Sequence, residues 1–236
     1  MAGDFAGRTV VVTGGTGALG TAVLDRLLDE GAICHVPTSH ASRPKGFAFA
    51  RHGRVELAQK VDLSDAASVE AFYESVPDLW ASIHVAGAFA MSPVGEAAAD
   101  AFTEMMDTNA KTAFFCCSAA ARAMLATGTA GRIVNVTARA GLDPRKGAAM
   151  SAYTASKAAV AAITVALAEE LKSNGILVNA VAPSTLDTAA NRKAMPKADT
   201  SKWVSPSSLS GVVRFLLSDA ARDITGAEIP VYGRSP

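Results

Sequence analysis

The chain has 236 residues, half of them hydrophobic, and its 22 basic and 22 acidic side chains leave no formal net charge. This balance argues against a nucleic acid or an anionic membrane surface as the main partner, because both favour a basic patch, and no apolar run reaches the roughly 18–20 residues of a membrane span. The N-terminus lacks the pattern of a secretory signal, three cysteines make no disulfide framework and no residues have metal-ligand spacing, so we expect a cytoplasmic protein without a bound metal.

Short β-branched runs alternate with alanine-rich stretches along the whole chain. The first kind predicts strands over 9–13, 32–36, part of 54–63, 81–87, 131–138, 176–183 and 227–233. The second kind predicts helices over 18–30, 64–76 (with Ser64 as N-cap), 97–126, 152–173 and 209–218. Strands this apolar are typical of a parallel sheet that crossover helices cover on each side. The sequence therefore predicts a single doubly wound α/β (Rossmann) domain over residues 1–236, with a parallel sheet of about seven strands and helices on both faces.

A glycine-rich turn, TGGTGALG at 13–20, follows the first strand and opens the first helix. Its glycines have the G-x-G-x-x-G spacing, in the strand–turn–helix context that gives this spacing its meaning. Such a turn favours positive φ, and a pyrophosphate must reach backbone N–H groups at the helix N-terminus without a Cβ in the way. An ordinary glycine-rich turn is the alternative. The predicted dinucleotide-binding residues here are Gly14, Gly15, Thr16, Gly17, Ala18, Leu19 and Gly20.

The end of the second strand indicates which dinucleotide this turn would hold. An NAD site usually has an acidic residue about 20 residues after the turn, which bonds the ribose 2′-hydroxyl. Here VPTSHASR places Thr38 and Ser39 at that point, and Arg43 follows. An uncharged, hydroxyl-rich pocket beside an arginine tolerates a 2′-phosphate, so NADP(H) is the favoured cofactor and NAD(H) the alternative. The preference disappears if Arg43 is simply a solvated loop residue.

Tyr153 and Lys157, within SAYTASKAAV at 151–160, lie on one face of a predicted helix. An ammonium beside a phenol favours the phenolate and lowers the phenol pKa from its usual value of about 10. Such a tyrosine can exchange a proton with a substrate oxygen, which is typically worth about 10²–10⁴ in rate. A surface pair is the alternative for the motif in isolation, but the glycine turn upstream favours the catalytic interpretation.

Eight stretches share an order and spacing that are highly specific together: TGGTGALG, VDLSD, HVAG, TNAKTAFF, GRIVNVTA, YTASK, ILVNAVAPS and FLLSDAARDITG. With them the chain resembles the short-chain dehydrogenase/reductase family over nearly its whole length. The resemblance implies that Tyr153 is the catalytic acid/base, that Lys157 binds the nicotinamide ribose and that Asn109 holds a water of the proton relay. It implies further dinucleotide contacts at Asp62, Leu63, Ala86, Gly87, Pro183, Ser184, Thr185, Leu186 and Thr188.

Two departures from the family pattern concern the site itself. After IVNV the family usually has two serines, the second of them catalytic, whereas this chain has Thr137 and Ala138. Adjacent side chains on a strand point to opposite faces, so Thr137 is a poor substitute for the missing serine. The family's NNAG is HVAG here; we expect His84 to be a packed or hydrogen-bonded structural residue, with recruitment to the chemistry as the alternative.

Dihydropteridine reductases are the branch of the family that accommodates these departures. They resemble this chain in a GGxGALG turn, in a VAG after the fourth strand, in the missing serine and in a run like TLDTAANRKAMPKADTSKW at 185–203. A quinonoid dihydropterin accepts hydride readily and needs less oxyanion stabilisation than a ketone. Thr38, however, replaces the aspartate of a true dihydropteridine reductase, and the C-terminal part looks more like ordinary bacterial-type members.

Residues 184–208 are predicted to form a substrate lid, because an irregular segment of this length is usually functional. Met195 and Trp203 would close over the substrate beside Ala138, or else pack the lid onto the body of the domain. The alanine-rich helices at 97–126 and 152–173 resemble those that pair relatives in a four-helix interface. This implies a homodimer or homotetramer, with a monomer as the alternative.

The sequence thus predicts an NAD(P)H-dependent reductase that transfers hydride to a carbonyl or a quinonoid pterin-like small molecule. A ketone or 3-oxoacyl reductase that uses a donor other than the missing serine is one alternative. A non-catalytic dinucleotide sensor or scaffold is another, although a pure binder needs no tuned phenol. Lyase or epimerase chemistry on the same fold is a third.

Overall fold

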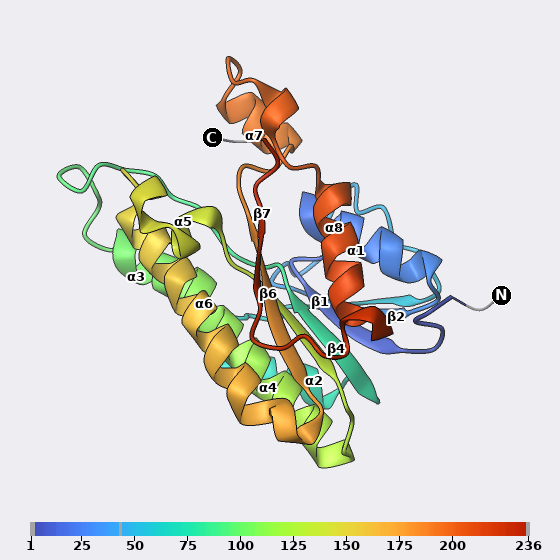
Figure 1. The fold of residues 1–236 in the computed structure, drawn as a ribbon. Helices are drawn as coiled ribbons and strands as arrows, with labels where there is room; N and C mark the ends of the chain where they lie inside the picture. Colours follow the sequence, from blue (N-terminus) through green and yellow to red (C-terminus); the bar gives the residue numbers. More distant parts are fainter. Residues whose placement is uncertain (1–2, 43, 235–236) are drawn as a thin grey trace.

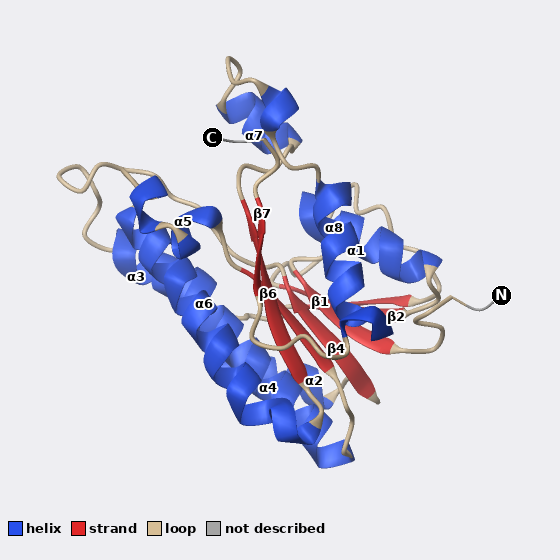
Figure 2. Ribbon diagram, in the orientation of Figure 1, coloured by secondary structure: helices blue, strands red, loops and turns tan. Residues whose placement is uncertain are grey.

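A computed structural model describes residues 3–42 and 44–234, and it contains one seven-stranded parallel sheet. The strand order is β3-β2-β1-β4-β5-β6-β7, with the crossover at β1 and β4 that a doubly wound sheet requires (Figure 1, Figure 2). The strands are β1 (Thr9–Thr13), β2 (Ile33–Thr38), β3 (Val55–Gln59), β4 (Leu79–His84), β5 (Arg132–Val136), β6 (Leu177–Pro183) and β7 (Glu228–Val231). The predicted fold class is confirmed.

Helices cover both faces of the sheet, and each face has its own apolar core. On one face lie α1 (Ala18–Asp29) and α8 (Pro206–Leu217), at the right of Figure 1. On the other face lie α2 (Ala66–Glu74), α4 (Thr112–Thr127) and α6 (Ser151–Leu171). Because apolar strand residues alternate between the two cores, a strand such as β1 is buried over its whole length. The described residues also include three short α-helices: α3 (Ala101–Met105), α5 (Arg139–Leu142) and α7 (Ala189–Ala194).

Several predicted boundaries differ from the structure for local reasons. The N-cap of α2 is Asp65, whose carboxylate accepts from Ser68 N at 3.1 Å, and the prediction of Ser64 is wrong because Ser64 bonds Asp62 instead. The predicted helix over 97–126 starts only at α3 and contains a π-helical turn before α4. The predicted irregular segment 184–208 contains α7, which was missed because it has only two turns.

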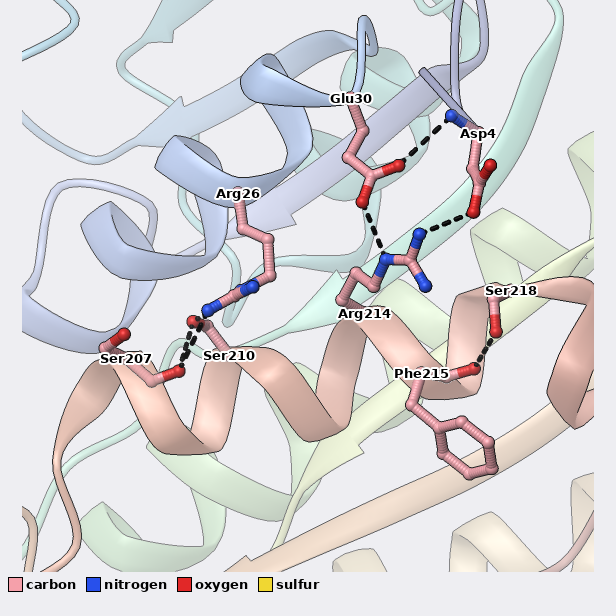
Figure 3. Close-up of polar contacts among 8 residues, drawn as sticks. All are labelled: Asp4, Arg26, Glu30, Ser207, Ser210, Arg214, Phe215 and Ser218. Carbon is pink, nitrogen blue, oxygen red and sulfur yellow. Dashed lines mark hydrogen bonds and ion pairs between the residues drawn. The ribbon is translucent and has the colours of Figure 1, made fainter.

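Polar contacts join α8 to α1 and to the segment before β1 (Figure 3). The Arg214 guanidinium, on α8, donates to Glu30 Oε1 at 2.7 Å and also pairs with Asp4. The hydrogen bond from Arg214 lowers the pKa of the Glu30 carboxyl. On the same interface Arg26 Nε donates to Ser210 Oγ, 3.4 Å away. These contacts hold the helix that follows the segment 184–205 against the first βα unit.

By length and composition alone, the helical stretch Ser151–Asn174 is long and apolar enough to cross a membrane, which the sequence analysis did not predict. In the structure this stretch packs against β6 and α4 and carries Tyr153 and Lys157 near its start. The core helix of a globular domain has the same length and composition, so this feature is weak support for a membrane span.

Candidate active site

Loops that follow separate strands meet at the carboxyl edge of the sheet. The hydroxyl of Thr13, at the end of β1, accepts a hydrogen bond from Ala86 N, 3.2 Å away in the loop after β4. The Lys157 ammonium, on α6, donates to the carbonyl of Val136 at the end of β5, 2.9 Å away. The predicted glycine turn, the VAG loop and the Tyr–Lys pair are therefore brought to one place. Parallel strands cause this, because all their carboxyl ends lie at the same edge.

The glycine turn between β1 and α1 is packed too closely for side chains at three positions. Gly14 has φ +65°, and a Cβ on it would lie 2.7 Å from Ala86 N. A Cβ on Gly20 would lie 2.2 Å from the carbonyl oxygen of Gly14. A Cβ on Gly15 would lie 2.8 Å from Val36 Cγ1. These glycines let the turn pack against its own strand and against the loop after β4.

Gly17 has a different role, because packing leaves room for a side chain there. It is the N-cap of α1, no side chain caps that helix, and a Cβ would approach only Gly14 O, at 3.4 Å. The first N–H groups of α1, beginning at Ala18 and Leu19, therefore have no side-chain acceptor at the positive end of the helix dipole. This arrangement fits the pyrophosphate of a dinucleotide.

Alanine substitutions at Gly17 and Gly14 are expected to separate binding from folding. Gly17→Ala should change the free energy of unfolding by about 0.5 kcal/mol or less, yet raise the Kd for NADP(H) by about tenfold or more, because its methyl group stands before the helix N-terminus. Gly14→Ala should cost about 1–3 kcal/mol, since it forces positive φ on a residue that also meets backbone. Calorimetric titration and urea unfolding measure both quantities. An unchanged Kd in Gly17→Ala would place the pyrophosphate elsewhere.

The predicted adenine side lies at the ends of β2 and β3. Thr38 is buried and its Oγ1 accepts from His40 N at 3.3 Å, whereas Ser39 is exposed. Asp62 is exposed, and Oδ1 of its carboxylate accepts from Ser64 N at 2.9 Å and from Ser64 Oγ at 2.7 Å. These two bonds lower the pKa of the Asp62 carboxyl, so it is ionised at neutral pH.

Backbone contacts join the two halves of this adenine side. Val61 N donates to the carbonyl of Thr38 at 3.0 Å, which places the segment that leads to Asp62 beside the end of β2. Leu63 is partly buried and packs its side chain into the core beneath α2 and α4. Arg43, predicted to face a 2′-phosphate, lies outside the described residues, so the preference for NADP(H) stays a prediction.

Tyr153 and Lys157 are one helical turn apart at the start of α6. Burial raises the pKa of the Tyr153 phenol to about 12 and lowers the pKa of the Lys157 ammonium to about 8. The prediction that Lys157 lowers the pKa of Tyr153 is wrong for this structure, because the only cause of that shift is burial, and the ammonium donates to Val136 O. Among the described residues nothing hydrogen-bonds Tyr153 Oη, so this hydroxyl is free to bond a ligand oxygen.

Asn109 lies in the π-helical turn Met106–Lys111, and such turns occur frequently at functional sites. Its Oδ1 accepts from Ala88 N and its Nδ2 donates to Ala88 O, both at 3.0 Å. Nδ2 also donates to Ser156 Oγ at 3.1 Å. The side chain therefore fastens the loop after β4 to α6, between Tyr153 and Lys157. Ser156 was not predicted, although its place inside YTASK was the signal; the water-relay role of Asn109 stays a prediction.

The loop after β4 contributes two further features to the site. A Cβ on Gly87 would lie 3.3 Å from Lys157 Nζ, so the absence of a side chain keeps the space beside the ammonium open. Phe89 contacts the Tyr153 ring edge to face, with ring centroids 5.0 Å apart. Phe89 was not predicted; its signal in the sequence is a single aromatic residue two positions after the VAG motif.

Ala138 stands at the position where the family usually has its catalytic serine. Ala138 is buried at the N-cap of α5, with extended backbone and no hydroxyl to offer a substrate. Thr137 is buried as well, and its hydroxyl donates to the carbonyl of Val181 on β6 at 3.2 Å. Because β5 ends at Val136, strand alternation does not set the direction of the Thr137 side chain; its bond to Val181 keeps the hydroxyl from replacing the serine. Tyr153 has no hydroxyl partner from this part of β5.

His84 belongs to a buried polar network inside the sheet. Its Nδ1 lies 2.7 Å from Asn135 Oδ1, and its Nε2 lies 2.8 Å from Ser82 Oγ and 3.3 Å from Tyr73 Oη. Because an amide oxygen only accepts, Nδ1 carries the proton and Nε2 accepts, which is the neutral form. Burial lowers the pKa of His84 to about 4. The structural interpretation of His84 is confirmed.

The segment after β6 is held mainly by backbone and capping contacts. Ser184 Oγ donates to Tyr232 O at 2.8 Å, and Thr185 O accepts from Val204 N at 2.9 Å. Leu186 forms an isolated bridge with Val204. The predicted dinucleotide segment from Pro183 onward thus starts at the carboxyl end of β6, at the same edge as the glycine turn.

The predicted lid stands above the carboxyl edge of the sheet, around α7 in Figure 1. Thr188 is the N-cap of α7 and its hydroxyl accepts from Asn191 N, and Met195 at the other end of the helix is exposed. Trp203 is partly buried. The ring that contacts Tyr153 is Phe89, and closure of Met195 and Trp203 over a substrate stays a prediction.

Comparison with known proteins agrees with this geometry. The family profile described as short chain dehydrogenase matches residues 8–199. A galactitol 2-dehydrogenase from Rhizobium johnstonii is 32% identical over 95% of this chain and 93% of its own. The short chain dehydrogenase/reductase notP' from Aspergillus versicolor is 30% identical over 96% of this chain and 86% of its own. A solved short chain dehydrogenase/reductase family protein superposes with a TM-score of 0.88 at 30% identity, and covers 98% of this chain and 97% of its own.

The match runs through the glycine turn, the loop after β4, the π-helical turn and the Tyr–Lys helix, which are the parts that the structure gathers at one edge of the sheet. Relatives with this architecture are dehydrogenases and oxidoreductases. The family profile match and the groups gathered at the carboxyl edge of the sheet lead to one conclusion. The chain belongs to the short-chain dehydrogenase/reductase family and is an NAD(P)-dependent oxidoreductase.

Proposed function

We propose that this protein transfers hydride between NADP(H) and a small molecule that carries a carbonyl or an imine-like acceptor, with Tyr153 as the acid/base. The observation that carries the proposal is the Tyr153 hydroxyl, which has no hydrogen-bond partner among the described residues. The Tyr153 ring contacts Phe89 in the loop after β4, the same loop that bonds the end of β1 at Thr13. A sensor that only binds a dinucleotide needs no such free phenol, so catalysis is favoured over a scaffold.

Different residues of the chain would bind the dinucleotide and transfer the proton. The glycine turn and the N-terminus of α1 would hold the pyrophosphate, and the Lys157 ammonium, with donors left beyond Val136 O, would bond the nicotinamide ribose. The dinucleotide, when bound, supplies the hydride. Tyr153 Oη donates its proton to the substrate oxygen or nitrogen as that atom gains charge, and takes it back in the reverse direction. Asn109 keeps the loop after β4 against α6 during this exchange.

We propose a quinonoid dihydropterin as the first substrate to test, with ketones and 3-oxoacyl thioesters as the alternatives. The alanine at position 138 is the reason for testing the pterin before the ketones. A ketone gains an oxyanion that two hydroxyl donors usually stabilise, and here β5 offers none, because Ala138 has no hydroxyl and the Thr137 hydroxyl faces β6. An electron-poor pterin needs less of this stabilisation.

A turnover assay on the purified protein tests the proposed function. Nicotinamide absorbance is followed with NADPH and NADH in separate runs, and each is offered quinonoid dihydropterin, a small panel of ketones and 3-oxoacyl thioesters. Oxidation with the pterin supports the pterin assignment, whereas activity on ketones alone means that another donor replaces the serine. If both dinucleotides bind and no acceptor is reduced, the protein is better described as a sensor.

The affinity for NADP(H) is expected to fall as the pH rises through about 8, the pKa of the buried Lys157 ammonium. If the charged form bonds the ribose, the dinucleotide binds the protonated protein better, so the Kd should rise by up to about tenfold per pH unit above that value. Calorimetric titration at several pH values measures the profile. Lys157→Met should bind weakly with a flat profile; an equal slope in the variant would assign the titration to another group.

We also propose a homodimer or homotetramer assembled through α4 and α6. Exposed apolar side chains on these helices support it, namely Phe114, Leu125 and Val165. Apolar side chains of this size are normally buried, and an interface between copies of the chain would cover them. The expected light-scattering mass is about twice or four times that of the chain, and Val165→Glu is expected to lower it towards a monomer because a charge in the interface is not compensated. A monomeric wild type would contradict the proposal.

A further inference from the structure

The strongest unassigned feature beside the site is the loop at 87–95, which we call the Phe89 loop. Its sequence, GAFAMSPVG, contains no charged residue. Phe89 is 62% exposed, Met91 64% and Val94 84%, although apolar side chains of this size are normally buried. Part of the Phe89 ring lies against Tyr153, at an interplanar angle of 78°. An exposed apolar surface therefore begins at the ring of the proposed acid/base.

The Phe89 loop is anchored on both sides of Phe89. The backbone of Ala88 exchanges two hydrogen bonds with the Asn109 side chain, each 3.0 Å long. Three residues after Phe89, Ser92 N donates to Ala149 O at 2.7 Å. Ala149 has φ +60°, a conformation that is costly for a residue with a Cβ and that persists only where the surroundings enforce it. The hydrogen bonds to Asn109 and to Ala149 therefore hold the backbone on both sides of Phe89. The position of Phe89 does not depend on its ring contact with Tyr153 alone.

We infer that Phe89 is a specificity-determining residue, which selects substrates whose reacting carbon or nitrogen carries an apolar, preferably planar group over polyhydroxylated ones. The inference rests on the proposed function of Tyr153. A substrate atom bonded to Tyr153 Oη has its substituents near that ring, and Phe89 contacts the ring with centroids 5.0 Å apart. Exposed apolar surface is favourable there only when a ligand covers it. Polyol hydroxyls would lose water against Phe89 without gaining a partner from it, because the phenyl ring has no hydrogen-bonding group.

Binding without turnover tests the inference separately from the proposed function. Acetophenone and erythrulose, a ketotetrose that keeps an open-chain carbonyl, are titrated in the presence of NADP⁺ by saturation-transfer NMR. The wild type is expected to bind acetophenone and to bind erythrulose at least about tenfold more weakly. Phe89→Ala should weaken acetophenone binding by about 10–100-fold and leave erythrulose binding unchanged, and Phe89→Leu should restore most of the affinity for acetophenone. Phe215→Ala, which removes a partly exposed ring on α8 on the other face of the sheet, is the matched control.

The outcomes separate a specificity role from a structural one. Equal losses for both ketones would mean that Phe89 only positions Tyr153 and would overturn the inference. Failure of the wild type to bind acetophenone, or affinity unchanged in Phe89→Ala, would overturn it as well. If binding behaves as expected but no acceptor is reduced, the inference about Phe89 stands and the proposed hydride transfer fails. Where turnover occurs, the change should appear in KM more than in kcat, with the pH profile of kcat unaltered.

Discussion

Replacing Tyr153 with phenylalanine is expected to lower kcat/KM by about 10²–10⁴ while the fold and the dinucleotide affinity stay as they were. The loss is large because, in the proposed function, this hydroxyl moves the proton to the substrate. Stability is expected to be nearly unchanged, within about 0.5 kcal/mol. The hydroxyl has no partner among the described residues, and the ring contact with Phe89 is retained. Steady-state kinetics and urea unfolding, measured on the same preparation, provide both numbers.

Tyr73→Phe is the matched control, because Tyr73 differs from Tyr153 in what its hydroxyl touches. Tyr73 is buried, and its Oη lies 2.7 Å from Ser82 Oγ and 3.3 Å from His84 Nε2. Its removal should cost about 1–3 kcal/mol of stability, since buried partners lose a hydrogen bond, but little activity below the unfolding transition. If Tyr153→Phe retained full turnover with every acceptor, the acid/base role would be wrong and a non-catalytic dinucleotide binder would become the better description.

Acid is expected to destabilise the fold through His84, by about 3 kcal/mol between pH 7 and pH 4. The folded pKa is lowered to about 4 by burial, whereas the unfolded residue has its ordinary value near 6.5. Between these values the unfolded chain binds a proton that the folded chain excludes. Stability is therefore fully present above pH 6.5 and is lost as the pH falls towards 4. The residues that contact the ring, Ser82, Tyr73, Asn135 and Cys117, do not change charge in this window.

Urea unfolding at half-unit intervals from pH 4 to pH 8 measures this dependence. His84→Asn is the informative variant, because its amide can keep the bond to Asn135 in place of Nδ1 and does not titrate. Its stability should be lower at pH 7 but nearly flat where that of the wild type falls. A variant with the same slope as the wild type would show that other groups, such as paired carboxylates, cause the acid sensitivity. The described contacts of the His84 ring include neither Tyr153 nor Lys157, so kcat near neutral pH should change little.

Periodicity and glycine spacing were sufficient to predict the doubly wound fold. Each strand of the sheet is covered on both faces, so its apolar run is continuous and is visible without any partner. The turn at 13–20 could also be predicted from the sequence, because positive φ at Gly14 and close packing at Gly20 restrict these two positions to glycine. Tyr153, Lys157 and the loss of the serine at Ala138 could likewise be located from the motif alone. The same reasoning missed α7, whose two turns are too short for a helical period.

The tertiary structure decided the pKa values and the hydrogen-bond partners of the residues in these motifs. The sequence predicted that Lys157 lowers the pKa of Tyr153, but the ammonium turns to Val136 O, and burial raises the phenol pKa instead. His84 could be assigned to the core only once Asn135 and Ser82, from two different strands, were found on its two nitrogens. Phe89 could be assigned to the site only from the tertiary structure, in which its ring contacts Tyr153 at the start of α6. By itself the sequence determined the fold, the glycine turn and the positions of the reactive groups, because these depend on spacing along one chain. Their ionisation, their partners and the apolar surface beside Tyr153 depend on distances between segments that are remote in sequence, and only the packed sheet brings those segments together.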